Sequence, residues 1–165
     1  MKGKISIFLA AAACFFCLQS YADGTRPNLA LNKPAVCSSF EKANQYNGNK
    51  DSVPGLVTDG DKQTRWSSDY FNDADPNLAW IYVDLGSKVD ISEVKIFWEA
   101  AMAKVFSIEV SDDAKTWTSI SDIKGNFLPQ TDVKIDKPVS GRYVRINCKE
   151  RKTQYGYSIF EIEVY

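Results

Sequence analysis

Short stretches in which apolar and polar residues alternate, separated by turns, fill most of the chain from residue 79 onward. Alternation with a period of two is the pattern of a β-strand that buries one face and exposes the other. The segments with this pattern are 35–40, 80–86, 89–98, 106–111, 133–135, 142–148 and 158–165, and Trp117 opens a further one. Almost no helix is indicated. The sequence therefore predicts an all-β fold, an antiparallel β-sandwich or barrel.

The spacing also predicts irregular points. After Ile91 the apolar spacing widens to three residues, which indicates a β-bulge or a turn near Ser92 and Glu93. Four surface loops are expected where turn-forming residues are frequent and the apolar period is lost, at 41–54, 67–77, 124–130 and 149–157.

The first 22 residues have the features of a secretory signal peptide. Met1–Lys4 is basic, and the apolar stretch Ile5–Phe16 is too short to span a bilayer. Small residues at Ser20 and Ala22 indicate cleavage after Ala22. The sequence therefore predicts a secreted, periplasmic or cell-surface protein.

Lipidation at Cys14 or Cys17 is the alternative processing route, although the residues before them match a lipoprotein site poorly. Cleavage after Ala22 would leave 165 − 22 = 143 residues, which suffices for one domain with its own core, at 23–165.

Charge and composition exclude several functions. The mature chain would carry 18 basic and 21 acidic residues, a net charge of −3, so no basic excess favours nucleic-acid binding. The chain contains no histidine, which removes the usual general base, the usual catalytic triads and the usual zinc ligand. We therefore expect a non-catalytic protein.

Two cysteines remain after the predicted cleavage, Cys37 and Cys148, near opposite ends of the domain. In an oxidising compartment such a pair favours a disulfide between an early and a late strand. The alternative is two free buried thiols, which behave as small apolar residues.

A turn rich in hard oxygen atoms lies at 55–66. Asp59 and Asp61 flank Gly60, and the hydroxyl of Thr64 follows three residues later. Carboxylates, hydroxyls and inward-facing carbonyls are the ligands that Ca²⁺ prefers. A solvated Asp-Gly turn between two strands is the alternative interpretation of the same residues.

Aromatic residues are frequent in the predicted loops: Tyr46, Tyr70, Phe71, Phe127, Tyr155 and Tyr157. A ring that faces the apolar side of a pyranose, with charged and amide groups on its hydroxyls, is a usual way to bind a sugar, and loops at one end of a sandwich can present such groups. The alternative is that each ring covers the end of the core.

Several motifs, in order along the whole mature chain, resemble the coagulation factor V/VIII C-domain (discoidin) family, and within it the bacterial family 32 carbohydrate-binding modules. They are Asn28–Pro34 with Ser38-Ser39, Thr58–Asp61 with Thr64–Ser68, Trp80–Gly86, Trp98-Glu99 with Ala103-Lys104, Ile108–Ser111, Arg142–Arg145, and Tyr155–Ser158 through Glu161. The resemblance implies a jelly-roll β-sandwich of the galactose-binding-domain type.

The same resemblance implies one structural Ca²⁺ that ties the last strand to the turn at 55–66. Its ligands would be the carbonyl of Leu56, the side chain of Asp59, the carbonyl of Asp61, the hydroxyl and carbonyl of Thr64, the carbonyl of Phe160 and the carboxylate of Glu161.

The resemblance also implies a glycan as the partner, of unspecified sugar, bound by a secreted module without catalysis. The candidate ligand-binding residues are Glu41, Tyr46, Glu99, Lys104, Phe127 and Tyr155. Glu99 and Lys104 could equally form an ion pair that closes a turn. Many galactose-binding members use a loop histidine, which this chain lacks, so a galactose site of that kind is not expected.

Two alternative functions remain open. The animal branch of the family binds membrane surfaces or proteins, and Phe127 and Leu128 beside Lys149, Arg151 and Lys152 could serve such contacts. The net negative charge argues against membrane binding. The other alternative is an adhesive or accessory subunit that docks onto a separate glycoside hydrolase.

Overall fold

The structure is a computed structural model that describes residues 26–75 and 77–165. The elements of this part are β1 (Ala35–Cys37), η1 (Pro54–Val57, a 3-10 turn), β2 (Trp66–Ser67), β3 (Ala79–Trp98), β4 (Ala103–Ser111), β5 (Thr118–Lys124), β6 (Gln130–Arg151) and β7 (Ser158–Val164). All strand pairs are antiparallel. The predicted signal peptide, residues 1–22, lies outside the described residues.

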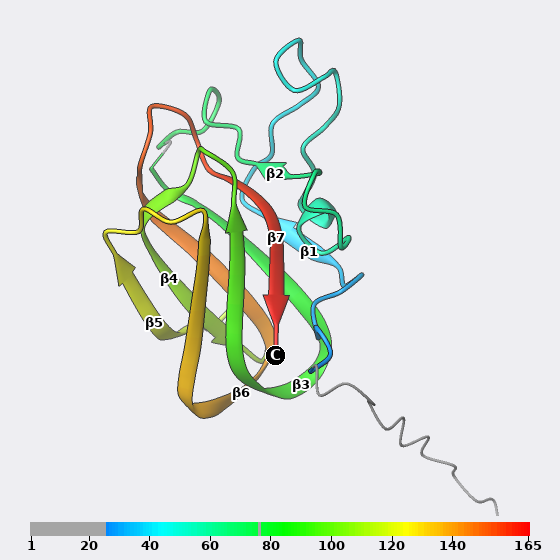
Figure 1. Cartoon of the computed structure of the whole chain (residues 1–165), viewed down its shortest axis with the longest axis vertical. Coiled ribbons are helices and arrows are strands. Elements are labelled where there is room, and N and C mark those ends of the chain that lie inside the picture. The colour runs from blue at the N-terminus through cyan, green and yellow to red at the C-terminus, as the bar shows by residue number, and fades with distance from the viewer. Residues whose placement is uncertain (1–25, 76) are drawn as a thin grey trace, which may run out of the picture.

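Two long strands build both layers of a β-sandwich (Figure 1). The strands are hydrogen-bonded in the order β2-β7-β3-β6-β4-β5, with β1 added on β3. The first half of β3 pairs with β1, and its second half pairs with β7. The second half of β6 pairs with β4. We call the layer of β1, β4 and β5 the back layer and the layer of β2 and β7 the front layer. The predicted all-β sandwich is confirmed.

The predicted strand boundaries differ from the observed ones at the bends. Segments 80–86 and 89–98 are one continuous strand, β3, which is bulged between Asp84 and Val89. Gly86 lies in this bulge with φ of 89°, a value that residues with a Cβ rarely adopt. Segments 133–135 and 142–148 are likewise one strand, β6. The predicted bulge near Ser92 and Glu93 is confirmed, because the register shifts between Ile91 and Glu93.

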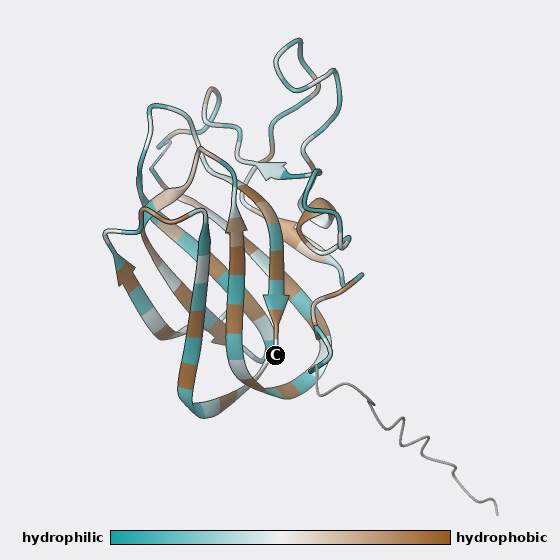
Figure 2. Cartoon of the chain, in the orientation of Figure 1, coloured by the Kyte–Doolittle hydropathy of each residue, from teal (hydrophilic) through white to brown (hydrophobic). Residues whose placement is uncertain are grey.

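The core lies between the two layers, and its residues follow the predicted alternation (Figure 2). Ile81, Ile108 and Ile146 from the back layer and Ile96 and Ile162 from the front layer are fully or almost fully buried. Burial of each such side chain contributes about 1.5–3 kcal/mol. The core therefore fixes the strands on which the loops of the next subsection are mounted.

The predicted disulfide between Cys37 and Cys148 is wrong in this structure, where both thiols are free. Cys37 pairs with Ile81 on one side of β3, and Cys148 pairs with Ala79 on the other side. Two strand spacings, with an offset of two residues along β3, separate their Cα atoms by more than about 10 Å, whereas a disulfide needs about 4.4–6.8 Å. Both thiols pack in the apolar core, and burial raises the pKa of Cys37 to about 11.

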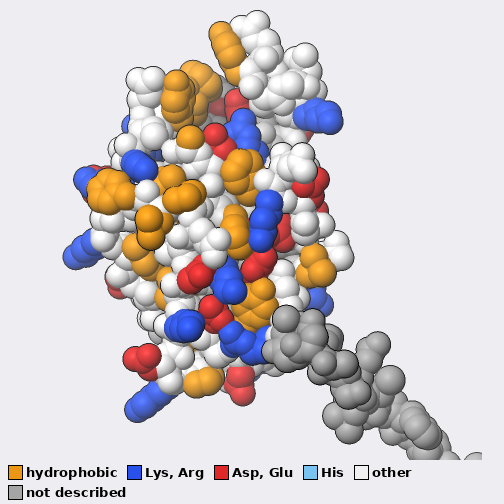
Figure 3. All heavy atoms as spheres, in the orientation of Figure 1, with side chains coloured by type: hydrophobic (Ala, Val, Ile, Leu, Met, Phe, Trp, Pro, Cys, Tyr) orange, Lys and Arg blue, Asp and Glu red, His pale blue; other side chains and the backbone are white. Residues whose placement is uncertain are grey.

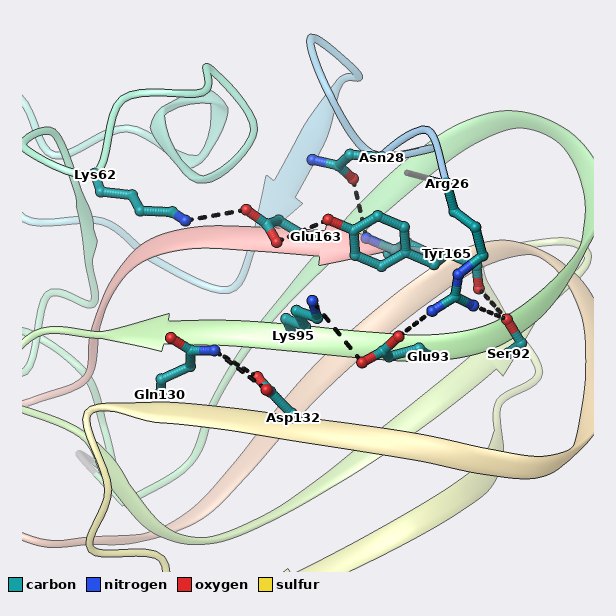
Figure 4. Close-up of polar contacts among 11 residues, drawn as sticks. Arg26, Asn28, Lys62, Ser92, Glu93, Lys95, Gln130, Asp132, Glu163 and Tyr165 are labelled. Carbon is teal, nitrogen blue, oxygen red and sulfur yellow. Dashed lines mark hydrogen bonds and ion pairs between the residues drawn. The ribbon is translucent and has the colours of Figure 1, made fainter. Parts of the chain in front are cut away.

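The two ends of the described chain meet at the end of the sandwich where β7 finishes (Figures 1 and 4). Leu29 N donates to Val164 O at 2.8 Å, and Val164 N donates to Asn28 Oδ1 at 3.0 Å. Arg26 donates to Ser92 and forms an ion pair with Glu93, and its guanidinium lies 5.2 Å from the ring centroid of Tyr165. These contacts fasten the first described residues to the last strand.

No helix in the described part of the chain is long and apolar enough to span a membrane.

Candidate functional site

Four loops meet at the end of the sandwich away from the chain termini (Figure 1). They follow β1, β2, β3 and β6, and their ends are fixed by the core strands. Hydrophobic side chains are exposed at this end as well as elsewhere on the same face (Figure 3). Tyr46, Phe71 and Tyr155 are strongly exposed there, at 81%, 67% and 53%. Exposed rings of this number on one small area indicate a binding surface.

A pocket of about 510 Å³ opens between these loops. Its walls come from all four loops and from β2 with the residue before it: Glu41, Tyr46, Arg65, Ser67, Ser68, Tyr70, Phe71, Glu99, Ala100, Ala101, Tyr155, Gly156 and Tyr157. This volume lies within the usual range of small-molecule sites, about 300–1,000 Å³.

The floor of the pocket is buried and well bonded. Ser67 and Ser68 lie on or next to β2, and Tyr157 lies just before β7. Ser68 Oγ accepts a hydrogen bond from Tyr157 N at 3.0 Å, and the Tyr157 hydroxyl donates to Asn77 O at 2.7 Å. A Cβ at Gly156 would lie 2.5 Å from Ser68 Oγ and 2.9 Å from Tyr70 Cβ, so only glycine allows the two loops to approach this closely.

Three charged side chains reach the pocket above this floor. Arg65 Nη1 donates to Ser67 Oγ at 2.9 Å and to Ser158 Oγ at 3.1 Å, and it lies 4.0 Å from Glu99 Oε2. Glu99 Oε2 also accepts a hydrogen bond from Ala101 N at 2.9 Å. Arg65 and Glu99 are each 30% exposed at their side chains, so the ligand can reach both. With Glu41, the pocket carries two carboxylates and one guanidinium.

Asn44 holds Glu41 and the loop around it. Its Nδ2 donates to Glu41 Oε1 at 2.8 Å, and its Oδ1 accepts hydrogen bonds from Tyr46 N at 2.7 Å and Asn47 N at 3.2 Å. Asn49 N donates to Asn44 O at 2.9 Å. One amide therefore orients both the carboxylate and the exposed ring that this loop brings to the pocket.

Aromatic side chains form the mouth of the pocket. The rings of Tyr70 and Phe71 lie 4.0 Å apart at an angle of 34°, and Tyr155 approaches Tyr70 edge-on at 6.4 Å. Tyr46 completes the set from the loop after β1. These rings offer apolar faces to a ligand whose polar groups reach the charged residues below.

The structure brings Glu41, Tyr46, Glu99 and Tyr155 together, as the sequence analysis proposed, but Lys104 and Phe127 do not line the pocket. Lys104 forms an ion pair with Glu150, not with Glu99, because Lys104 already belongs to β4 and faces β6 there. The alternative of an ion pair between Glu99 and Lys104 is therefore wrong. Phe127 is 58% exposed on the loop between β5 and β6.

Sequence reasoning missed Arg65, Ser67 and Ser68 as pocket residues. One signal was available for Arg65, because the large apolar Trp66 must face the core and its neighbour must then face away. Trp66 is fully buried, and its Nε1 donates to Ser39 O at 3.0 Å. Tyr70, Phe71 and Tyr157 were recognised only as loop aromatics.

The turn at 55–66 lies against the front layer. Asp59 Oδ1 accepts from Asp61 N at 2.8 Å, and Asp59 Oδ2 accepts from the Thr64 hydroxyl at 2.6 Å. Thr64 Oγ1 also lies 3.0 Å from Asp61 O. Lys62 forms an ion pair with Glu163 of β7 at 3.1 Å (Figure 4), and its Nζ lies 3.5 Å from the ring centroid of Phe97. The turn is thus fastened to the last strand.

Glu161 lies under this turn, and only one of its two carboxylate oxygens accepts a hydrogen bond. The residue is 1% exposed, and its Oε1 accepts one hydrogen bond, from Gly60 N at 3.3 Å. Its Oε2 is buried and has no hydrogen-bond partner among the described residues. Burial, together with the nearby charges of Asp59 and Glu163, raises the pKa of Glu161 to about 7. A buried acceptor without a partner is costly, so this carboxylate is a destabilising feature of the site.

The backbone next to Glu161 is irregular. The register places Ile159 opposite Trp98 and Glu161 opposite Phe97, so Phe160 is the extra residue of a β-bulge and stands outside the ladder. Its carbonyl is one of the predicted ligands. No group of three His, Cys, Asp or Glu side chains suited to a metal occurs in the described residues, and the predicted ligand set instead relies on carbonyls, one hydroxyl and two carboxylates.

The basic residues that the alternative function assigns to membrane binding form contacts within the protein. Lys149 forms an ion pair with Asp122 at 3.1 Å, Arg151 Nε donates to Asn77 Oδ1 at 3.2 Å, and Lys152 Nζ donates to Phe127 O at 3.3 Å. Only the charge of Lys149 is balanced by a carboxylate in these three contacts, whereas Arg151 and Lys152 bond neutral oxygens and hold the loops together.

A β-sandwich with a pocket between its end loops is the architecture of a binding module. Residues 35–162 match the F5/8 type C domain model, and the chain belongs to that family. No curated protein matches the chain significantly.

Solved structures place the chain near bacterial carbohydrate-binding modules. It is 36% identical to chitosan-binding module 1 of a chitosanase/glucanase from Paenibacillus sp. IK-5, with a TM-score of 0.74, over 85% of this chain and 99% of that one. It is 37% identical to chitosan-binding module 2 of the same enzyme, solved with chitotriose, with a TM-score of 0.73, over 84% and 99%. A family 32 module of NanJ from Clostridium perfringens, solved with galactose, shares 19% identity, 81% and 93% coverage and a TM-score of 0.65, and so shares the fold.

Proposed function

We propose that this protein binds glycans rich in glucosamine, of the chitosan type, in the pocket at the loop end. The observation that carries the proposal is the pairing of two accessible carboxylates, Glu41 and Glu99, with a set of exposed rings in one pocket. The similar modules of Paenibacillus sp. IK-5 are described as chitosan-binding, which supports the same sugar class.

The pocket chemistry suits a sugar that carries a positive charge. The ammonium group of glucosamine can donate hydrogen bonds to a carboxylate, and such charge-assisted bonds are about twice as strong as neutral ones. Arg65 offers donors to sugar hydroxyls, and the rings cover the apolar pyranose face. Because two carboxylates face one guanidinium, the pocket favours a cationic ligand over an anionic one.

Calorimetry with chitosan oligomers and with their fully N-acetylated counterparts tests this proposal. We expect the deacetylated oligomers to bind more tightly and their binding to weaken as salt rises. Glu41→Gln should weaken binding about tenfold, because it removes the charge and keeps the shape. Glu150→Gln is the matched control, since it removes an exposed carboxylate at the same end that does not line the pocket.

Equal binding of the acetylated and deacetylated oligomers, or equal effects of the two substitutions, would contradict the assignment. Co-sedimentation with anionic lipid vesicles addresses the membrane alternative, for which we expect no binding.

We also propose one structural Ca²⁺ between the turn at 55–66 and β7. The unpartnered Oε2 of Glu161 and the bulge at Phe160 support it. Asp59, Thr64 and Glu161 would hold the ion with their side chains, and Leu56, Asp61 and Phe160 would add carbonyls. Hard oxygen ligands of this mixed kind suit Ca²⁺. The ion would neutralise the buried carboxylate and stabilise the fold.

Export is the third part of the proposal. Lys2 and Lys4, the apolar stretch Ile5–Phe16, and the small residues Ser20 and Ala22 support removal of a signal peptide after Ala22. N-terminal sequencing of the protein recovered outside the cytoplasm should begin at Asp23. A lipid-modified cysteine at position 14 or 17 would show the alternative route.

A further inference from the structure

We infer that the outer face of the back layer binds a chain of uncharged sugars, at a site separate from the loop-end pocket. The first half of β3, the second half of β6, β4 and β5 lie side by side in this layer. Four aromatic side chains gather on the face, apart from the residues that line the pocket, and we call them the back-face rings: Trp80, Tyr82, Trp117 and Tyr143. The inference does not depend on the proposed function of the pocket.

The alternation that builds the core also places these rings on the outside. Ile81 and Ile146 are fully buried between the two layers. Successive side chains of a strand point to opposite faces, so Trp80 and Tyr82, on either side of Ile81, point outward. Tyr143 points outward from β6 for the same reason. Outward positions of a sandwich are usually polar, so large rings there call for a role beyond the core.

The back-face rings form one apolar surface centred on Tyr82. The ring centroid of Tyr82 lies 5.7 Å from that of Trp80, with the two planes at 10°, and 5.4 Å from that of Trp117. Tyr143 meets Tyr82 edge-on at 5.7 Å. Each of the four rings is half-buried, so part of its surface stays exposed to water. Aromatic surface of this kind packs well on the apolar face of a pyranose.

A fixed polar network lies next to the rings. Glu109 is 8% exposed, and its Oε1 accepts hydrogen bonds from Ser107 Oγ at 2.8 Å and from Asn147 Nδ2 at 3.0 Å. Its Oε2 accepts from Arg145 Nε at 2.6 Å, and the Arg145 guanidinium lies 4.1 Å from the ring centroid of Trp117. Asn147 Oδ1 accepts no hydrogen bond from the described residues, so it can accept one from a sugar hydroxyl. Rings beside a few well-placed polar groups are the usual composition of a ligand site.

The charges around the rings cancel, which decides the kind of ligand. Three ion pairs balance them: Asp84 with Arg142, Glu109 with Arg145, and Asp122 with Lys149. An ionic ligand would have to compete with these internal partners, whereas an uncharged sugar needs only ring surface and hydrogen bonds. The pocket differs, because it carries two carboxylates and one guanidinium. The two surfaces therefore suit sugars of different charge.

Depletion of the protein by the insoluble polymer of β-1,4-linked N-acetylglucosamine tests the site, because this polymer carries no amine charge. The parent protein should bind it with an affinity that changes less than about twofold as salt rises, since no charge pairing is involved. Trp80→Ala should weaken the binding about tenfold by removing one ring of the set.

Two control variants accompany this experiment. Phe127→Ala removes an exposed ring that belongs neither to the back face nor to the pocket, and it should keep the parent affinity. Glu41→Gln changes the pocket alone, so it should also bind the uncharged polymer as the parent does.

A measurement on the parent protein removes any dependence on how the variants fold. Two of the four tryptophans, Trp66 and Trp98, are buried in the core, whereas Trp80 and Trp117 lie on the back face. In an NMR titration with the fully N-acetylated β-1,4 hexasaccharide, the indole N–H signals of Trp80 and Trp117 should shift. The signals of the two core tryptophans should stay in place.

Failure of the parent protein to bind the polymer, or unmoved signals of the back-face tryptophans, would overturn the inference. So would equal affinities of Trp80→Ala and the parent, because the rings would then serve only to stabilise the sheet. A parent dimer that becomes a monomer in Trp80→Ala, measured by analytical ultracentrifugation, would instead make the face an interface between two copies and would also overturn it. Each of these results leaves the proposed function intact, since that function is tested with deacetylated oligomers and Glu41→Gln.

Discussion

Two carboxylates in this molecule, Glu41 in the loop-end pocket and Glu161 under the turn at 55–66, are held in opposite ways. Glu41 is partly exposed, and Asn44 orients it through a neutral hydrogen bond. Glu161 is buried, and one of its oxygens has no partner in the described residues. The first arrangement suits a ligand that comes and goes from solvent, whereas the second suits an ion that stays and becomes part of the fold.

The comparison shows what burial does to the same chemical group. An accessible carboxylate keeps water as an alternative partner, so it costs little when the ligand is absent. A buried one has no such alternative, and its pKa rises as the charged form becomes costly. Each of the following changes tests one side of this difference.

The largest effect should come from Ca²⁺ at Glu161. At a Ca²⁺ concentration 100 times its dissociation constant, the free energy of unfolding should rise by about 2.7 kcal/mol, and Tm should rise by roughly 5–10 °C. Thermal unfolding of the chelator-treated protein, with and without added Ca²⁺, measures this. Glu161→Gln should abolish the response, because the amide removes the charge that the ion neutralises.

Glu163→Gln is the control for this experiment, since Glu163 lies on the same strand but bonds Lys62 and Tyr165. It should keep the response to Ca²⁺. An equal Tm with chelator and with Ca²⁺ in the parent protein would contradict the ion site.

The next effect should come from Gly156, where the loop before β7 approaches the loop after β2. Gly156→Ala should lower the free energy of unfolding by about 1–3 kcal/mol, because its Cβ would displace Ser68 Oγ from Tyr157 N. It should also weaken sugar binding, since Ser68 and Tyr157 form the pocket floor. Urea denaturation and calorimetry measure the two losses.

Gly55→Ala serves as the control, because its Cβ would meet no atom within 4 Å. If the two alanine variants are equally stable and bind equally well, the close approach at Gly156 does not constrain the pocket.

The smallest effect should come from Asn44, which positions Glu41 without contributing charge. Asn44→Ala should weaken binding of deacetylated chitosan oligomers about fivefold, or about 1 kcal/mol, by freeing the Glu41 carboxylate and the Tyr46 loop. Gln130→Ala, which removes an exposed amide bond to Asp132 on the front layer, should leave binding unchanged. Unchanged affinity in Asn44→Ala would show that the hydrogen bond from Asn44 does not position Glu41 for binding.

The strands were predictable because apolar and polar residues alternate along each of them, and alternate residues of a strand point to opposite faces of the sheet. The bulge after Ile91 was predictable for the same reason. The continuity of β3 through Gly86 was not, since a glycine and polar neighbours indicate a turn locally. Only pairing with β6 on both sides of the bend keeps the strand intact.

The pocket was only partly predictable, because its residues come from loops whose meeting depends on the whole sandwich. Glu41 and Tyr155 stood out as polar and aromatic residues in loops. Lys104 was also predicted to bind the ligand, because it lies close to Glu99 in the sequence. It belongs to β4 instead, and there its side chain forms an ion pair with Glu150. The disulfide prediction failed likewise, since the sequence does not show that β3 separates Cys37 from Cys148.

The position of the first and last described residues has a practical consequence. Because Arg26 and Tyr165 lie together at the end of the sandwich opposite the loop-end pocket, a label, a bead or a second copy fused after Tyr165 should leave the pocket open. Two copies joined by a flexible linker could engage one polymer strand at once. The gain in avidity would then depend on linker length rather than on any new contact.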